Sequence, residues 1–426
     1  MKIINISGRD QNILKELIER KSEIASNPGH TERRRLWQEL NDLEPRRPMV
    51  WINEIPWEEM EVDNELQVRT EDPLLQRVEK RLRRQIYKWE HMPADMVVED
   101  RIKSPLVIQD SGYGIKEGDS FVISLEEDPE EQVDNAANYE NLIESTEDLE
   151  QIEPPQIAFD KNRSEERYGK LQEIAGDVIN VEKKGLPGFW WAPWDMLVTW
   201  YGVEDALRDL IMNPELLHAA MERLVDVSMA ALGELEEKNL LASNNSNVRV
   251  GSGGYGYTTD LPGDRKSWDQ VSTGDIWGMS AAQIFSEVSG EMHEEFALNY
   301  EKEWLEEFGL TYYGCCEPLH DKMDIMKEVT TLRKVSMSPW ADYSKAAKEV
   351  GGEFVISYKP NPSVLAKEEW NPELARRELR EDLAELEGCP FEVIMKDVST
   401  VRNEPQRLWE WENIAMEEVQ KLAGNS

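Results

Sequence analysis

Five short β-prone runs mark the second half of the chain: NVRVGSGG (247–254), LTYYGCC (310–316), LRKVSMSP (332–339), EFVISYKP (353–360) and FEVIMKDVS (391–399). Between them lie segments with helical periodicity, such as 281–308 and 342–350. Strands and helices in this alternation are typical of a parallel sheet. Four such units, with room for about four more upstream, predict an α/β fold of the (β/α)8 TIM-barrel type. A doubly wound sheet is the alternative, and the lack of a GxGxxG turn after any candidate strand weakens it.

The first half of the chain adds an extension and an insertion to this expected barrel. Residues 10–45 have a charged helical pattern, and the apolar run PMVWI (48–52) suits a first buried strand. We therefore expect an N-terminal helical extension over 1–47 and a TIM-barrel catalytic domain over 48–426. An acidic stretch at about 118–166 is too poor in apolar residues to build a core and is expected to be a solvated insertion. Residues 203–240 predict two amphipathic helices, the second beginning at Pro214.

Composition excludes several classes of partner. The chain of 426 residues has 86 acidic and 48 basic side chains, a formal net charge of −38, which repels nucleic-acid phosphates and anionic lipid heads. It has no uncharged run near 18 residues, the length of a membrane span. Three cysteines cannot form a disulfide framework. These features predict a soluble cytoplasmic protein that binds neither nucleic acid nor membranes.

Polar residues gather where the predicted strands end, and the carboxyl ends of barrel strands carry the chemistry of such folds. The candidates from four strands are Cys315, Cys316, Glu317 and His320, then Ser338 and Asp342, then Lys359 and Asn361, then Lys396, Asp397 and Ser399. Converging from separate strands, they could surround one site.

The string YGCCEPLH offers thiolate, carboxylate and imidazole groups within a few residues, which is the ligand set of zinc sites. The candidate metal ligands are Cys315, Cys316, Glu317 and His320. Adjacent residues of an extended chain point to opposite sides, so one of the two cysteines is expected to point inward. His320 could equally cap or pack the following helix. The aromatic run FWWAPW (189–194) is expected to be core rather than a substrate wall.

Several strings together resemble the uroporphyrinogen decarboxylase superfamily, within it the branch of cobalamin-dependent methyltransferases. The strings cover roughly residues 189–400: WYGVEDALRDLIMNPELLHAAMERL, SAAQIFSEVSGEMHEEFALNYEKEWLEEFGLTYYGCCEPLHDKMDIM, VSMSPWAD and SYKPNPSVLA. The resemblance implies a TIM barrel, in agreement with the alternation of strands and helices. It also implies transfer of a methyl group involving a corrinoid.

Departures from the family narrow what the resemblance implies. An acidic loop, NEIPWEEMEVDNE (53–65), stands where decarboxylases of the family have an arginine-rich one, which argues against a polyanionic tetrapyrrole substrate. In thiol-specific corrinoid methyltransferases a histidine and two cysteines hold zinc. Here Tyr313 stands at the histidine position, Cys315 at the first cysteine, and Lys396 or Asp397 near the second. The family's zinc site is thus not intact, and any metal would need an altered ligand set.

Because it lacks the full zinc triad, the chain resembles those members of this branch that are the substrate-side methyltransferases of anaerobic O-demethylase systems. The resemblance implies a corrinoid (cobalamin) carried by a partner corrinoid-binding protein, and a small methylated substrate, with a methoxylated aromatic as one option. Lys359, Lys396 or Tyr313 could then stabilise the departing oxygen, and Asn361 and Asp397 complete the expected catalytic set. A homodimer is compatible with this expectation. The alternatives are a decarboxylase-like enzyme acting on another carboxylated substrate, and a non-catalytic binding barrel.

Overall fold

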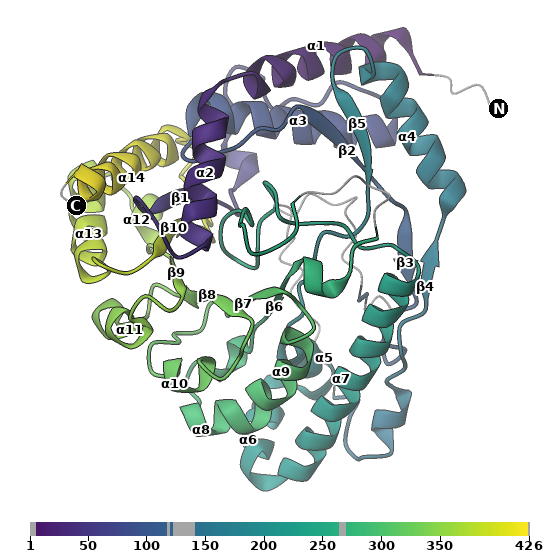
Figure 1. Cartoon of the computed structure of the whole chain (residues 1–426), viewed down its shortest axis with the longest axis vertical. Coiled ribbons are helices and arrows are strands. Elements are labelled where there is room, and N and C mark those ends of the chain that lie inside the picture. The colour runs from purple at the N-terminus through teal and green to yellow at the C-terminus, as the bar shows by residue number, and fades with distance from the viewer. Residues whose placement is uncertain (1–5, 117–119, 122–140, 264–269, 425–426) are drawn as a thin grey trace.

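The structure is a computed structural model that describes residues 6–116, 120–121, 141–263 and 270–424 (Figure 1). Within these ranges, no helix combines the length and the apolar character needed to pass through a bilayer. Much of the predicted acidic insertion, residues 118–119 and 122–140, lies outside the described residues. Its described remainder contains the short helix η2 (Asp148–Gln151) and the strand β4 (Ile157–Phe159), and it runs into the helix α4 (Lys161–Ala175).

A parallel sheet of six strands forms the centre of this mixed α/β fold. In spatial order the strands are β1 (Met49–Ile52), β10 (Phe391–Met395), β9 (Val355–Tyr358), β8 (Leu332–Met337), β7 (Leu310–Tyr313) and β6 (Trp277–Ser280). Nearly every residue of these strands is buried, as expected for a parallel sheet covered on both faces. The sequence predictions of strands at PMVWI, LTYYGCC, LRKVSMSP, EFVISYKP and FEVIMKDVS are confirmed.

Helices connect these parallel strands, which cannot be joined by tight hairpins. They are α8 (Gly290–His293), the π-helical η5 (Glu294–Leu298), α9 (Asn299–Leu305), α10 (Met323–Met326), α11 (Tyr343–Val350), α12 (Ser363–Ala366) and α13 (Pro372–Glu385). The helix α14 (Gln406–Gly424) follows β10 and packs against α13. Figure 1 shows α10, α11 and α13 outside the strands. Helix α7 (Pro214–Glu237) begins at Pro214 after α6 (Val203–Met212), as predicted.

Two smaller sheets accompany the central one. Strands β2 (Arg101–Pro105) and β5 (Asn180–Lys184) are parallel, and β3 (Ile108–Asp110) is antiparallel to β4. A single parallel bridge between Leu186 and Leu241 continues from β5. Over the described part of the chain, β1 and β6 are the edges of the central sheet, and its ladder hydrogen bonds do not join them into a closed ring.

One predicted strand is wrong. NVRVGSGG (247–254) is a turn, with one isolated antiparallel bridge between Arg249 and Tyr255. Gly251 has a φ of 54°, a left-handed conformation that favours glycine. Val250 donates its N–H to the Gly254 carbonyl at 3.0 Å, which closes the turn. The alternating apolar residues of this run therefore belong to a tight loop. Ser252, which follows Gly251 in this loop, is buried.

The N-terminal helices α1 (Gly8–Ala25) and α2 (Gly29–Asn41) share their cores with the rest of the molecule. Leu14 and Ile18 of α1 belong to one cluster with Leu82 of α3 (Pro73–His91) and Ile102 of β2. Trp37 of α2 is fully buried beside residues of β1 and β10. The predicted extension is thus helical and packed against the strands.

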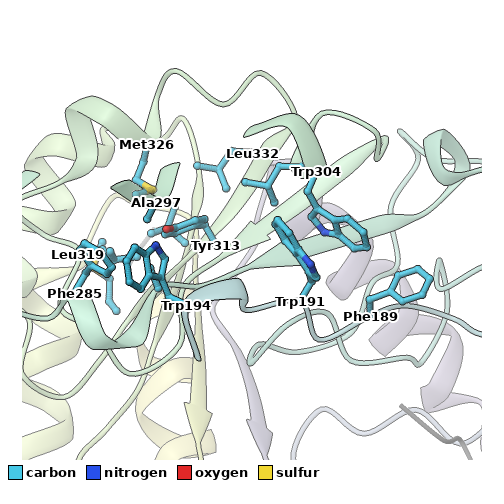
Figure 2. Packing of buried hydrophobic residues seen from close by; sticks show 14 of the residues in the cluster. Phe189, Trp191, Trp194, Phe285, Ala297, Trp304, Tyr313, Leu319, Met326 and Leu332 are labelled. Carbon is cyan, nitrogen blue, oxygen red and sulfur yellow. The ribbon is translucent and has the colours of Figure 1, made fainter. Parts of the chain in front are cut away.

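The aromatic run FWWAPW contributes to the core, as expected. Trp194 packs edge-on against Phe285 with ring centroids 4.8 Å apart, and Trp191 stacks on Trp304 at 4.6 Å. Figure 2 shows these rings and Phe189 within the buried cluster. Trp194 is the second residue of α5 (Pro193–Tyr201) and donates its ring N–H to the Phe296 carbonyl at 2.9 Å. The large rings thus fix this segment against the helices that follow β6.

Asp72 caps α3, and its loss tests how much this helix depends on its first turn. Its carboxylate accepts the N–H groups of Leu74 at 2.9 Å and Leu75 at 3.2 Å, and pairs with Lys170 at 3.0 Å. We expect Asp72→Ala to lower the free energy of unfolding by about 1 kcal/mol. Asp72→Asn keeps the cap but not the ion pair, and should cost less. Urea unfolding of both variants measures the difference, and equal losses would contradict a capping role.

Candidate functional site

The carboxyl edge of the central sheet brings together side chains from segments far apart in sequence. Glu54 follows β1 by two residues, Cys315 follows β7 by two, and Lys359 and Lys396 directly follow β9 and β10. The carboxyl ends of parallel strands lie at one edge of a sheet, where ligands of α/β proteins usually bind. This edge is therefore the candidate active site.

The Cys315 thiol lies next to an ammonium group. Lys396 Nζ is 3.3 Å from Cys315 Sγ, and Cys316 Sγ is 3.5 Å from Cys315 Sγ. Cys315 is buried and Cys316 is exposed, so one cysteine of the pair points inward, as predicted. The contact with Cys316 and the positive charges of Lys359 and Lys396 lower the pKa of Cys315 well below its usual range, and they outweigh burial. The same contact raises the pKa of Cys316. These surroundings thus favour the thiolate form of Cys315.

Two carboxylates complete the surroundings of Lys396. Its Nζ lies 3.2 Å from both Glu54 Oε2 and Asp397 Oδ2, and Glu54 Oε1 pairs with Arg249 at 3.1 Å. Burial would raise the pKa of Glu54, but Lys396, Asp397 and Arg249 lower it to about 2. Burial and the hydrogen bond with Glu54 raise the pKa of Asp397 to about 6. Burial would lower the pKa of Lys396, but Cys315, Glu54 and Asp397 raise it above its ordinary value. Lys396 therefore keeps its charge, while Asp397 can hold a proton near neutral pH.

Lys359 has a positioning role in this arrangement. Its buried Nζ donates to Ser252 Oγ at 2.5 Å, to the Cys315 carbonyl at 2.9 Å and to Ser336 Oγ, with Tyr312 OH at 3.4 Å. Ser336 Oγ in turn donates to the Cys315 carbonyl at 2.6 Å. These bonds tie the turn after β7 to β8, β9 and the glycine loop. Lys359 thus fixes the backbone that carries Cys315.

The candidate metal ligands do not form a metal-binding set. Glu317 is fully buried, and its carboxylate accepts the backbone N–H groups of Cys315 at 2.9 Å and Ala282 at 3.3 Å. His320 Nε2 lies 3.6 Å from Asp321 Oδ1, and the cation beside Cys315 is Lys396. Across the described ranges, no three His, Cys, Asp or Glu side chains are grouped to hold a metal ion. The Glu317 carboxylate is already bonded to backbone N–H groups, and the ammonium group of Lys396 contacts Cys315 Sγ. These residues therefore do not fit zinc.

The structure does not bring Tyr313 to this cluster. Its hydroxyl donates to Glu301 Oε2 at 2.5 Å and contacts His293 Nε2 at 2.7 Å, on the side of β7 that faces the helices. Figure 2 shows Tyr313 among the buried side chains near Trp194. Neighbouring residues of a strand point to opposite faces, so Tyr312 is the tyrosine directed toward Lys359.

Asn361 is also directed elsewhere. It is exposed, and its side-chain oxygen accepts the N–H of Ser363 at 3.0 Å, an Asx turn that starts α12. Asn361 therefore shapes the loop after β9 and does not join the contacts around Cys315.

The position of Tyr313 leads to a test of the buried carboxyl that it contacts. Burial raises the pKa of Glu301 to about 8, above the ordinary 4.5, so its protonated form stabilises the fold below that ordinary value and this stability is lost as pH rises toward 8. We expect Glu301 to lower the free energy of unfolding of the wild-type protein by about 2 kcal/mol as the pH rises from 5 to 7. Glu301→Gln should lack this dependence. His293, whose pKa burial lowers to about 3, titrates in both proteins. Urea unfolding at both pH values gives the difference, and parallel pH profiles would rule the idea out.

Two site residues have unusual backbone conformations. Glu54 and Asp397, which are not glycines, have φ values of 49° and 55°. Such left-handed positions cost of order 1 kcal/mol or more and persist where the surroundings impose them. Val398 donates its N–H to the Glu54 carbonyl at 3.2 Å, which links the two turns. Both carboxylates are thus held by the ends of the adjacent strands β1 and β10.

Sequence reasoning missed several members of the site. They are Glu54, Arg249, Ser252, Tyr312 and Ser336. The position of Glu54 just after the first strand was the available signal, because the same rule of strand ends selected Lys359 and Lys396. No sequence signal distinguishes Tyr312 from Tyr313 without the phase of the strand.

Comparisons with known proteins find little. No family model matches the chain, and no curated protein matches it. Among solved structures, a methyltransferase from Methanosarcina mazei aligns with 59% of this chain and 63% of its own, at 11% sequence identity and a TM-score of 0.37. The chain thus spans less than two thirds of that protein's length. A likeness at this level carries no statement about fold or activity.

Proposed function

We propose that this protein is a methyltransferase that moves a methyl group from a small methylated donor to a corrinoid carried by a separate protein. A methoxylated aromatic is the first donor class to test. The proposal takes residues 48–426 as a TIM-barrel catalytic domain and 1–47 as its helical extension. Closure of the barrel is supported by the parallel pair β2 and β5 and the parallel bridge between Leu186 and Leu241, which have the parallel pairing of barrel strands although no ladder joins them to the central sheet.

The observation that carries the proposal is the contact of Lys396 with Cys315, Glu54 and Asp397 at the carboxyl edge of the sheet. Demethylation of an ether leaves charge on an oxygen atom, and a fixed cation or proton donor at that atom lowers the barrier. Lys396 stays a cation, because Cys315 and Glu54 outweigh the effect of burial on its pKa. A corrinoid in its cobalt(I) form supplies the nucleophile when bound.

Each residue of the cluster has a role in this proposal. Lys396 donates a hydrogen bond to the departing oxygen, and Asp397, whose pKa is about 6, supplies its proton. Glu54 orients Lys396. The Cys315 thiolate keeps Lys396 charged, and Lys359 holds the backbone of Cys315. This assignment uses no metal held by the chain.

The test mixes the protein with a reduced corrinoid protein and one methyl donor at a time, and follows the cobalt(I) absorbance. Loss of that absorbance with one donor class and formation of its demethylated product support the proposal. The control is the same mixture with heat-inactivated protein. No change with aromatic ethers, amines and thiols, with the corrinoid protein shown to be competent, would contradict it and favour decarboxylation of a carboxylated substrate.

A further inference from the structure

A pocket of about 190 Å³ lies beside the aromatic run FWWAPW and the helix α5, and Leu224 of α7 also lines it. Two of its lining residues, Trp190 and Ala192, pack in the apolar cluster that contains Cys315. Drug-sized ligands usually occupy about 300–1,000 Å³, so this pocket suits a smaller molecule. It is therefore a candidate site for a small ligand next to the cluster around Lys396.

Aromatic rings dominate the wall of this pocket. Five of the described lining residues are aromatic: Tyr113, Phe121, Phe189, Trp190 and Trp191. The rings of Phe121 and Phe189 lie 5.6 Å apart between centroids, and Trp191 stacks on Trp304 behind it (Figure 2). The face of an aromatic ring carries partial negative charge and attracts cations, and tryptophan does so most strongly.

Asp195 is the one charged side chain among the lining residues that the structure describes. Its partner is Gln283 of the short helix η4 (Gln283–Phe285), whose side-chain amide donates to Asp195 Oδ2 and whose backbone N–H also stabilises the carboxylate. Both of these groups are neutral, and within the described ranges no lysine, arginine or histidine pairs with Asp195. A carboxylate can accept about four hydrogen bonds, so Asp195 has capacity for a further partner.

The surroundings of Asp195 disfavour its charge. Burial raises the pKa of Asp195 to about 7, with smaller contributions from the charges of Glu317 and Cys315. A carboxylate that is withdrawn from water without a countercharge is unfavourable. A cation bound against Asp195 would supply the missing countercharge.

The other polar groups of the wall indicate which kind of cation fits. The lining hydroxyl groups of Tyr113, Ser120 and Thr199 are each bonded to another protein group. A metal ion needs several oxygen or nitrogen ligands, and a bare ammonium ion needs several hydrogen-bond acceptors. An ammonium group that carries methyl groups needs neither, because its charge is spread over an apolar surface that packs on aromatic rings.

We propose that this pocket binds a small organic cation with a methylated ammonium group. The rings around Trp190 pack against its methyl groups, and the carboxylate of Asp195 balances its charge. The proposal concerns binding alone, so it does not depend on methyl transfer.

The test compares choline with dimethylbutanol, its uncharged analogue in which carbon replaces nitrogen. Titration calorimetry of the full chain at about pH 8, where most of Asp195 is ionised, should show one saturable site for choline. The analogue has the same shape but lacks the charge, so it should bind at least roughly tenfold more weakly.

Two variants assign the binding to this pocket. Asp195→Asn keeps the size of the side chain and removes its charge, so it should weaken choline at least roughly tenfold and leave binding of dimethylbutanol unchanged. Trp190, which is partly exposed, is the ring that can be replaced with least disturbance of the core. Trp190→Leu should weaken choline, and Trp190→Phe, which keeps an aromatic face, should weaken it less.

The matched control is Asp226→Asn, which removes the same charge from an exposed position of α7 that does not line the pocket. It should bind choline as the wild type does. Thermal unfolding shows whether each variant is folded, and the two Trp190 variants decide the matter if Asp195→Asn is not. Equal affinity of the wild type for choline and dimethylbutanol, no saturable binding of choline at millimolar concentration, or equal weakening by Asp195→Asn and Asp226→Asn would overturn the proposal.

Discussion

Glu392→Ala is expected to lower the free energy of unfolding by about 3–5 kcal/mol, because it leaves a charged lysine alone in the core. Lys334 Nζ lies 2.9 Å from Glu392 Oε2, and neither side chain is exposed at all. Glu392 Oε1 also accepts the N–H of Gly254 at 3.1 Å. The mutation thus removes the partner of a buried cation and of a buried backbone N–H.

The control for this prediction is Lys334→Met/Glu392→Leu, which removes both charges and keeps similar volumes. Replacing a buried ion pair by apolar residues is often neutral or stabilising, so the double variant should recover most of the loss. Urea unfolding at neutral pH measures all three proteins. A double variant no more stable than Glu392→Ala would show that the volume and shape of Glu392, and not the stranded charge, cause the loss.

Lys396→Met is expected to reduce methyl transfer by about 10²–10³, the usual effect of removing one group that stabilises developing charge. The same change removes the ammonium group from Cys315 Sγ, so the pH at which this thiol ionises should rise. Thiolate absorbance followed against pH measures this second effect without any assay of activity. The rate of methyl transfer and the ionisation of the thiol together distinguish loss of the Lys396 charge from general damage to the fold.

The matched variant is Lys396→Arg, which keeps the charge. It should retain a low thiol pKa and recover part of the rate. Activity of Lys396→Met within about twofold of the wild type would refute the role given to Lys396, since loss of a catalytic proton donor or cation typically costs far more. A changed rate with an unchanged thiol ionisation would instead place Lys396 away from Cys315 in solution.

The strands of the second half were predictable because most are short runs in which apolar, β-branched and aromatic residues dominate, bounded by turn residues. LTYYG, FVISY and FEVIM show this directly, and Pro214 marked a helix start that the structure confirms. The strands β2 and β5 were not predictable in this way, because RIKSP and NVEKK contain charged residues, which favour a solvent-exposed segment. NVRVGSGG failed because its apolar alternation spans only four residues before glycine turns the chain.

The candidate site was partly predictable for a similar reason. Cys315, Lys359, Lys396 and Asp397 follow their strands by one or two residues. The structure joins them in a chain of contacts, from Lys359 to the Cys315 carbonyl, from Cys315 Sγ to Lys396, and from Lys396 to Asp397. Tyr313 and Asn361 stand at equally suitable positions in sequence but point away, because their direction depends on strand phase and on a local turn.

The left-handed conformations of Glu54 and Asp397 imply a conflict between stability and activity. Glycine at either position would adopt the same backbone without the steric cost, which is worth of order 1 kcal/mol. It would also remove the carboxylate that holds Lys396. Selection for thermal stability alone should therefore favour Asp397→Gly, because burial raises the pKa of this carboxyl and disfavours its charged form, and selection for turnover should restore the aspartate. At Glu54 the ion pairs with Lys396 and Arg249 outweigh the steric cost, so glycine should not be selected there. The turn at Asp397 would thus be the place where a laboratory evolution experiment separates the demands of folding from those of function.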